Sequence, residues 1–398
     1  MSRGKARTPP KLWNLIAISA IGPMALNIFI PSMPGMMEVF DTSYATVQLA
    51  LTLYLASLAS AQLFVGPMAD RWGRRPVALW GMVLSLIGTV ICIFSPSIQV
   101  LIFGRVVQAI GACTGIVMSR TIIRDMHGLD KAASMMGYVT MVMVVAPMFS
   151  PTIGGLLDQA FDWRAGFILV FICIILVLGA SVPLLGETHS GPFVAGNIGQ
   201  MFVGFGKLLK MPAFNRHAFQ ISLSSGAFFS FLGGAPYVSI QLMGISAAEY
   251  GLYFMAGGVG YMAGNFITGR MSERWGAEKL ITLGTTVGLL GGAELVITYV
   301  SGNFIPQALF GGMALIAFGN GLCLPSGTAG AVSADRDLTG TAAGLAGFMQ
   351  MATGAGASYL VGILLADTAA PLVIIMATSV TLAFLVNMIS LNHQNNLP

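Results

Sequence analysis

Two stretches of the sequence, in opposite halves of the chain, share one pattern. Residues 66–75 read GPMADRWGRR, and residues 269–276 read GRMSERWG. Gly, an acidic residue, Arg, Trp and Gly recur at the same spacing, and each stretch joins the end of one apolar run to the start of the next. Internal duplication of this kind is typical of transporters built from two related helical bundles. We therefore expect two similar halves.

The composition indicates that both halves lie in a membrane. Of the 398 residues, 56% are hydrophobic and 9% are charged, whereas soluble domains average about 25% charged residues. The apolar runs last roughly 20 residues, the length that a helix needs to cross the hydrocarbon core, and they lack the alternation of membrane β-strands. We predict an all-α membrane protein with twelve spanning helices. They lie near residues 12–36, 45–69, 76–96, 98–121, 132–157, 164–185, 214–240, 247–271, 279–300, 304–328, 338–364 and 368–390.

The spans divide the chain into two bundles of six helices. A pseudo-two-fold axis along the membrane normal would relate the two bundles. The predicted segments are a cytoplasmic tail at 1–11, an N-terminal bundle at 12–185, a central cytoplasmic linker at 186–212, a C-terminal bundle at 213–390 and a second cytoplasmic tail at 391–398.

The basic residues predict the orientation. With both termini in the cytoplasm, all 19 Lys and Arg except Arg105 and Arg164 fall on the cytoplasmic side, Arg120 among them near the loop after the fourth span. Such residues are retained on that side during insertion. We therefore expect an N-in, C-in, multi-pass protein of the bacterial inner membrane. No basic stripe is left over to suggest nucleic-acid binding.

The stretch 66–75 resembles the signature loop of the major facilitator superfamily, G-x-x-x-D-R-x-G-R-R. The resemblance implies the major facilitator fold and a gating role for Gly66, Asp70, Arg71, Gly73, Arg74 and Arg75. Asp70 would pair with Arg74 or Arg75 and face the positive N-terminus of a nearby helix. For the two arginines taken individually, the alternative is a solvated position in a basic loop.

Two further elements resemble motifs of the same superfamily. Residues 101–111, LIFGRVVQAIG, resemble its R-x-x-Q-G element, and they place Arg105 inside a span with Gln108 on the same helix face. An intramembrane Arg should face a water-filled cavity or a partner, and the alternative is a purely structural pairing. Residues 146–155, APMFSPTIGG, resemble the element that marks drug exporters, whose characteristic residues here are Ala146, Pro147, Pro151, Gly154 and Gly155. The alternative is a generic kinked helix.

Together with Pro67 and Pro76, these motifs are similar to the bicyclomycin/chloramphenicol-resistance branch (Bcr/CflA) of the twelve-helix drug:proton antiporters. That branch typically has D-x-Y-x-P-x-x-P in its first helix, whereas residues 27–34 here read NIFIPSMP. Asn27 cannot carry a proton, so the usual coupling carboxyl is missing. Glu294, the acidic residue within a predicted span, and Asp70 are the remaining candidates for proton coupling. The alternative for Glu294 is a position at the outer interface.

Polar side chains within the spans are candidates for a substrate cavity. They are Asn27, Tyr54, Arg105, Gln108, Tyr138, Tyr237 and Gln350. For each of them, an interhelical hydrogen bond is the alternative.

The leading functional hypothesis is export of small amphiphilic or apolar drugs by alternating access, as proton-coupled antiport. The alternative is a proton-coupled or facilitative carrier of a specific metabolite, and a third hypothesis is a sensor that keeps the fold and moves nothing. No nucleophile, metal or phosphate site suggests an enzyme. We expect no cofactor beyond the proton gradient, and as partners only the bilayer, the substrate and protons, with the chain acting as a monomer.

Overall fold

The computed structural model describes residues 10–126, 129–188, 198–335 and 338–395, without the side chains at 70, 124–125, 129–144, 198–202 and 390–395. The N-terminal half contains α1 (Leu12–Asn27), the 3-10 turn η1 (Ile30–Ser32), α2 (Met36–Val39), α3 (Tyr44–Trp72), α4 (Arg74–Ile93), α5 (Ile98–Met126), α6 (Leu129–Ala160) and α7 (Arg164–Leu184). The C-terminal half contains α8 (Ile198–Leu208), α9 (Pro212–Pro236), the π-turn η2 (Tyr237–Leu242), α10 (Ala247–Trp275), α11 (Ala277–Val300), α12 (Pro306–Val332), α13 (Thr339–Leu364) and α14 (Ala370–Asn395).

The all-α prediction is confirmed, since no strand occurs in the described ranges. Apart from the short α2 and α8, every α-helix there has 16 residues or more, and these long helices match the predicted spans. Eight helices among the described residues are long and apolar enough to cross a membrane. Of the other long helices, α9, α10 and α13 carry glycines and polar side chains that face neighbouring helices, which lowers their mean hydropathy.

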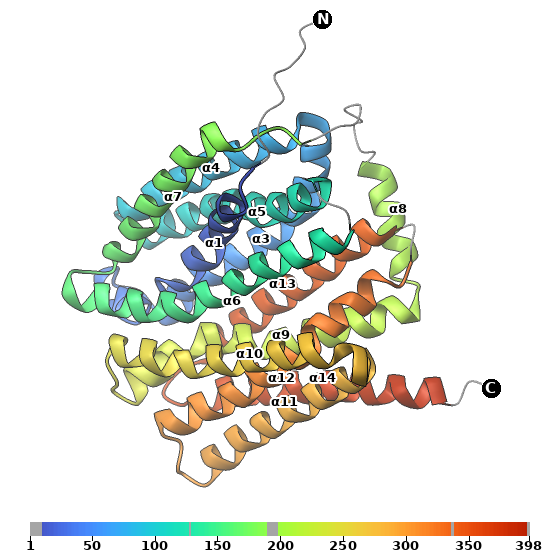
Figure 1. Ribbon diagram of the computed structural model, residues 1–398. Coiled ribbons are helices and arrows are strands. Elements are labelled where there is room, and N and C mark those ends of the chain that lie inside the picture. Colours follow the sequence, from blue (N-terminus) through green and yellow to red (C-terminus); the bar gives the residue numbers. More distant parts are fainter. Residues whose placement is uncertain (1–9, 127–128, 189–197, 336–337, 396–398) are drawn as a thin grey trace, which may run out of the picture.

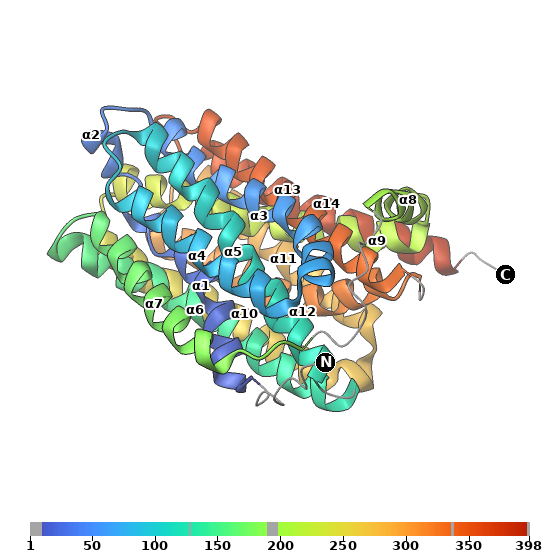
Figure 2. The same ribbon diagram turned by 90° about the horizontal axis from the view of Figure 1, so that it is seen from above.

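The helices form two bundles, coloured blue to green and yellow to red in Figure 1. Within the first bundle α5 packs against α1, α3 and α4; within the second, α12 packs against α9, α10 and α11. Two long contacts join the bundles, α3 with α13 and α6 with α10. The ends of α3 and α10 at Trp72 and Trp275 lie at one end of the molecule, together with α8, and we call this the basic end. Figure 2 shows α2 at the other end, called here the opposite end.

Several predicted boundaries were wrong. The first span was expected to reach residue 36, but α1 ends at Asn27, because Pro31 and Pro34 supply no backbone N–H groups to continue it. The linker predicted at 186–212 contains a further helix, α8. The apolar face of α8 packs through Phe205 and Leu208 on the second bundle. The last helix continues past residue 390 to Asn395.

The repeated motif has the same backbone shape in both halves. Gly73, between α3 and α4, has φ +94° and ψ 157°, and Gly276, between α10 and α11, has φ +77° and ψ 157°. Side-chain-bearing residues essentially never adopt this conformation. The sequence repeat therefore records a structural repeat in which one glycine reverses the chain between two antiparallel helices.

Glu187, which follows α7, caps the N-terminus of α4. Its carboxylate accepts hydrogen bonds from the backbone N–H of Arg74 (2.9 Å) and of Arg75 (3.3 Å). The Arg75 side chain donates in turn to the Leu185 carbonyl, with Nε 2.7 Å from the oxygen. A carboxylate at a helix N-terminus is stabilised by the unpaired N–H groups and by the helix dipole. These hydrogen bonds connect the segment that follows α7 to Arg74 and Arg75 of the signature loop.

This cap predicts unequal effects for two matched substitutions. An added Cβ at Gly73 would lie 2.4 Å from Glu187 Oε2, whereas one at Gly276 would meet nothing within 4 Å. Gly276→Ala should therefore cost only backbone strain, on the order of 1–3 kcal/mol. Gly73→Ala should cost about 1.5–3 kcal/mol more, because it also displaces a charge-assisted cap. Thermal unfolding midpoints of the purified variants measure this difference.

In a Glu187→Ala background the two glycine substitutions should become equal, since the cap is then already gone. Equal midpoints in the parent background would show that Glu187 does not brace this turn.

Candidate functional site

A cavity of about 950 Å³ lies between the two bundles. Its walls come from α1, α3, α5 and α6 of the first bundle, from α9, α10, α12 and α13 of the second, and from single residues of α4 and α8. It reaches the basic end, where Gly66, Arg74, Phe205 and Leu338 line it. A space shared by both bundles and reaching one end of them is the site that an alternating-access carrier requires.

Aromatic rings form much of the C-terminal wall. Phe228, Phe229 and Phe231 come from α9, Phe254 from α10 and Phe310 from α12. Phe231 meets Phe310 edge-on, with ring centroids 5.5 Å apart. Such rings offer a large apolar surface to a ligand and need few hydrogen bonds. Nothing in the sequence distinguishes these residues, because phenylalanines on an apolar helix look the same as lipid-facing ones until the helices are packed.

Two predicted cavity residues line this space. Asn27, at the end of α1, donates from Nδ2 to the Pro23 carbonyl (2.8 Å), and its Oδ1 is buried without a hydrogen-bond partner. Gln350, on α13, donates from Nε2 to the Ser225 hydroxyl oxygen (2.6 Å) on α9. Each bundle thus contributes a neutral polar group to an otherwise mainly apolar wall.

The predicted residues Tyr54, Arg105 and Gln108 do not line the cavity. They lie behind α1, inside the first bundle, where all three side chains are fully buried. Arg105 Nη1 donates to the Ala25 carbonyl (2.8 Å) and to Gln108 Oε1 (2.5 Å). The Tyr54 hydroxyl donates to the Gly22 carbonyl at 3.1 Å.

Aromatic rings cover the Arg105 guanidinium on two sides. Its central carbon lies 4.2 Å from the ring centre of Phe29 and 4.1 Å from that of Tyr54. Its Nε and Nη2 are buried without a hydrogen-bond partner. Cation–π contacts and a carbonyl therefore hold this charge within the bundle. The sequence predicted that Arg105 would need a partner or a cavity, and the structure supplies the partner.

Of the other predicted cavity residues, only Tyr237 has a described side chain, and it does not line the cavity. Tyr237 is in η2, where its ring packs on Tyr44 with centroids 4.7 Å apart, at the opposite end. Tyr138 is in α6, but its side chain lies outside the described part of the chain. The Asp70 side chain lies outside it as well.

The structure adds Arg120 to the cavity. The sequence prediction counted this residue with a cytoplasmic loop region. In the structure it lies inside α5, which continues to Met126, and its side chain is exposed to the cavity. Tyr261, on α10, also lines the cavity and interacts electrostatically with Arg120. The predicted span ended at residue 121, so Arg120 stood at its very end and was counted with the loop that follows, whereas α5 continues to Met126.

The drug-exporter motif on α6 lies where the bundles touch near the opposite end. An added Cβ at Gly155 would be 2.3 Å from the Ala247 carbonyl oxygen, and one at Gly251 would be 2.4 Å from the Thr152 Cα. The Thr152 hydroxyl donates to the Gly251 carbonyl at 2.7 Å. Gly154 packs on the Ile28 carbonyl of the first bundle, and Pro147 lines the cavity. The motif thus places α6 in direct backbone contact with α10.

A second pair of contacts joins the bundles near the opposite end. The Tyr44 hydroxyl donates to the Gly233 carbonyl at 2.7 Å, and Gln48 donates to the Ser358 carbonyl. Phe29 of the first bundle and Phe231 of the second belong to one buried apolar cluster around these contacts. The cavity is therefore closed toward the opposite end.

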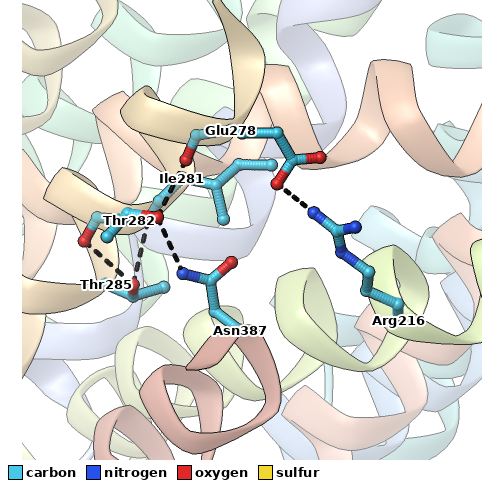
Figure 3. A network of polar contacts seen from close by, with 6 residues as sticks. All are labelled: Arg216, Glu278, Ile281, Thr282, Thr285 and Asn387. Atoms are coloured by element: carbon cyan, nitrogen blue, oxygen red, sulfur yellow. Dashed lines mark hydrogen bonds and ion pairs between the residues drawn. The ribbon is translucent and has the colours of Figure 1, made fainter. Parts of the chain in front are cut away.

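Polar contacts at the basic end bind helices of the second bundle to one another. Figure 3 shows Arg216 of α9 paired with Glu278 of α11, and Asn387 of α14 donating to the Thr282 hydroxyl (3.1 Å). Lys207 of α8 pairs with Asp335 at 2.6 Å, which holds the linker helix on the same bundle. These pairs connect helices within the second bundle.

Glu294 lies on α11, outside the cavity lining. One of its carboxyl oxygens is buried without a hydrogen-bond partner, and it rests against α12, where a Cβ added at Gly312 would be 2.2 Å away. The neighbouring Phe310 and Met313 of α12 line the cavity. One helix therefore separates Glu294 from the central space. Among the described residues, no cluster of His, Cys, Asp or Glu is arranged to hold a metal ion.

The sequence matches the Major Facilitator Superfamily over residues 15–358. The chain belongs to this family. The bicyclomycin resistance protein homolog of Haemophilus influenzae is 27% identical over 92% of each chain. Multidrug resistance protein D of Escherichia coli is 28% identical over 84% of each. The predicted resemblance to this resistance branch is confirmed, and the chain is a multi-pass protein of the bacterial inner membrane.

Solved structures show the same fold. A POT family transporter, crystallised with a thioalcohol-conjugated peptide, superposes with a TM-score of 0.79 over 96% of both chains at 13% identity. A bacterial homolog of the lysosomal transporter Spinster, in an inward-facing conformation, gives 0.68 over 95% of this chain and 93% of its own. The expected major facilitator fold, with its two six-helix bundles, is therefore confirmed.

The setting of Arg105 predicts that Lys cannot replace it. An ammonium group lacks the planar surface that lies between Phe29 and Tyr54, and it cannot reproduce the directed bonds of the guanidinium. Arg105→Lys should lower the free energy of unfolding by roughly 2–4 kcal/mol. Thermal unfolding in detergent measures the loss.

Arg164→Lys is the matched control. Arg164 also lies over an aromatic ring, 4.3 Å from the ring centre of Trp163, but its side chain is 38% exposed. Its replacement should shift stability by less than about 0.5 kcal/mol. Equal shifts in the two variants would contradict the stabilising role of the ring-covered pocket.

Proposed function

We propose that the chain exports small amphiphilic compounds from the cytoplasm by alternating access. The observation that carries this proposal is the cavity shared by both bundles, which reaches the basic end and is closed toward the opposite end. Its aromatic wall and few polar groups suit varied apolar ligands better than one densely hydrogen-bonded metabolite. The resistance functions named for two relatives favour the same reading.

In this proposal the basic end faces the cytoplasm and both termini lie there. The positive-inside rule supports that orientation. The cavity would then load from the cytoplasm, and rocking of one bundle against the other would separate the α6–α10 and α3–α13 contacts at the opposite end. Gly155 and Gly251 let α6 and α10 meet again without obstruction when the opposite end closes.

The proton gradient is the proposed energy source, with Glu294 and Asp70 as the candidate proton carriers. Glu294 supports this role because a carboxyl with an unpartnered oxygen inside a span is a functional candidate by default. It touches α12, which also lines the cavity. Protonation there would alter the packing of a helix that contacts substrate.

The alternative is a facilitative or proton-coupled carrier for a specific metabolite. One observation favours it: Asn27 lines the cavity at the position where the resistance branch typically has an acid. Among the described residues that line the cavity none is a carboxylate, so none of them offers a proton site in direct contact with substrate. In both cases the lipid bilayer and a small molecule are the partners, and we propose that one chain suffices.

Drug susceptibility tests the proposal directly. In a bacterium without its major efflux pumps, expression should raise the inhibitory concentration of chloramphenicol or bicyclomycin several-fold, and a protonophore should abolish the accompanying drug extrusion. No resistance to any amphiphilic drug would contradict the export function, and extrusion that survives the protonophore would contradict proton coupling.

Glu294→Gln tests the proposed carrier residue. It should reduce pH-driven extrusion at least about tenfold while substrate binding persists, because an amide cannot exchange a proton. Glu38→Gln, an exposed carboxylate at the opposite end, should leave extrusion unchanged. Extrusion by the Glu294 variant that still responds fully to the pH gradient would remove Glu294 from the mechanism.

A further inference from the structure

A second large space lies within the first bundle, between α3 and α4. Its volume is about 890 Å³. It is lined by residues of α3 between positions 56 and 72, by residues of α4 between 76 and 84, and by Ile110 and Thr114 of α5. We call this space the outer groove. In Figure 1, α4 lies on the side of the first bundle that faces away from the second bundle.

The outer groove and the central cavity lie on opposite faces of α3. Gln48 contacts Ser358 of the second bundle and Gln62 lines the central cavity, whereas Ser60 and Phe64 line the outer groove and are exposed. The described residues that line the two spaces have none in common. Because the outer groove is built by three helices of one bundle, movement of one bundle against the other would leave it intact. Its open side faces the bilayer.

The walls of the outer groove offer mainly hydrocarbon surface. The Trp80 side chain on α4 is 72% exposed, and Phe64 on α3 is exposed as well. Two of the hydroxyl groups in the walls already donate hydrogen bonds within their own helices, Ser60 to the Ala56 carbonyl (2.9 Å) and Thr114 to the Gly111 carbonyl (2.7 Å). An occupant therefore gains apolar contact and few hydrogen bonds, which suits a hydrocarbon chain better than a polar drug.

The length of the outer groove matches one leaflet of a bilayer. With a rise of 1.5 Å per residue, the part of α3 from Ala56 to Trp72 is about 24 Å long. Half of a bilayer, headgroups included, is about 20–22 Å thick. Trp72, at the basic end of the groove, is exposed, and tryptophan side chains favour the level of the headgroups. The groove thus runs from headgroup level toward the middle of the bilayer.

Positive charge lies at the headgroup end of the outer groove. Arg71 is exposed, and the centre of its guanidinium lies 5.8 Å from the ring centre of Trp72, which lines the groove. A lipid whose acyl chain lay between α3 and α4 would place its headgroup at this level. Guanidinium groups bind phosphate through two parallel charge-assisted hydrogen bonds. The groove and its mouth are therefore complementary to the two parts of a phospholipid.

We propose that the outer groove binds one phospholipid from the leaflet at the basic end, with an acyl chain between α3 and α4 and the phosphate at Arg71. This inference does not depend on the proposed transport function. Trp72 and Pro76, on either side of Gly73, both line the groove. The bound lipid therefore completes the packing beside the signature loop.

Native mass spectrometry of the purified full-length protein tests the proposal. Extended washing in detergent removes loosely associated lipid, and one phospholipid should remain on the protein. Ser60→Trp places a large ring in the groove and should lower this occupancy at least about tenfold. Arg71→Gln should lower it about tenfold, the effect of losing one charge-assisted contact.

Two matched variants are the controls. Ala293→Trp adds the same ring at an exposed position of α11, and Arg274→Gln removes the arginine that occupies the position of Arg71 in the repeated motif, also exposed. Both should keep the lipid. Trp80→Ala removes an exposed wall of the groove without adding bulk and should also lower occupancy, which keeps the test decisive if Ser60→Trp fails to fold.

Adding lipids back to the washed protein separates the acyl chain from the headgroup. Dioleoylphosphatidylglycerol should bind at least about tenfold more tightly than dioleoylglycerol, which has the same chains and no phosphate. Equal binding of the two would overturn the phosphate contact at Arg71. A parent protein that keeps no phospholipid, or equal occupancy in Ser60→Trp and Ala293→Trp, would overturn the lipid site. Release of the lipid by chloramphenicol at the concentrations that the protein exports would overturn it in favour of a drug site.

Discussion

Direct backbone contact between α6 and α10 is the constraint on which the rest of the structure depends. Gly155 and Gly251 bring the two helices so close that a single methyl group would collide with the facing backbone, and the Thr152 hydroxyl fixes their register on the Gly251 carbonyl. With the α3–α13 contact, this junction closes the opposite end and leaves the central cavity reaching the basic end. Small residues in such places let membrane helices approach closely without a hydrophobic driving force.

Two arginines of α5 show two ways in which this chain accommodates a positive charge within a membrane-spanning helix. Arg105 is sealed between Phe29 and Tyr54 and reaches a backbone carbonyl, so its charge contributes to packing and not to the cavity surface. Arg120, nearer the basic end of the same helix, is exposed to the cavity. Residues of one type on one helix thus take different roles, because one has rings packed over it and the other faces an open space.

Much of the fold was predictable from the sequence, for physical reasons. Apolar runs of bilayer length locate helices, and the recurrence of the 66–75 pattern at 269–276 predicts two like halves, which the equal backbone shape at Gly73 and Gly276 explains.

The cavity was less predictable. Asn27 and Gln350 were found because polar groups in spans are few, but nothing in the sequence distinguishes Phe231, which faces the cavity, from a lipid-facing ring. Tyr54 and Gln108 were misplaced because polarity reveals burial in a span without revealing which helix they face. The cap by Glu187 depends on a contact between residues distant in the chain.

The central claim is that the two bundles alternate about the cavity, opening one end as the other closes. Distances between spin labels across the bundles test this most directly. One pair joins Gln159 on α6 to Gln241 in η2 at the opposite end; a second joins Lys11, just before α1, to Lys279 on α11 at the basic end. All four positions are exposed. When substrate or a pH gradient is applied in liposomes, the first distance should lengthen as the second shortens. Distances that stay fixed, or that lengthen together, would contradict alternating access in this protein.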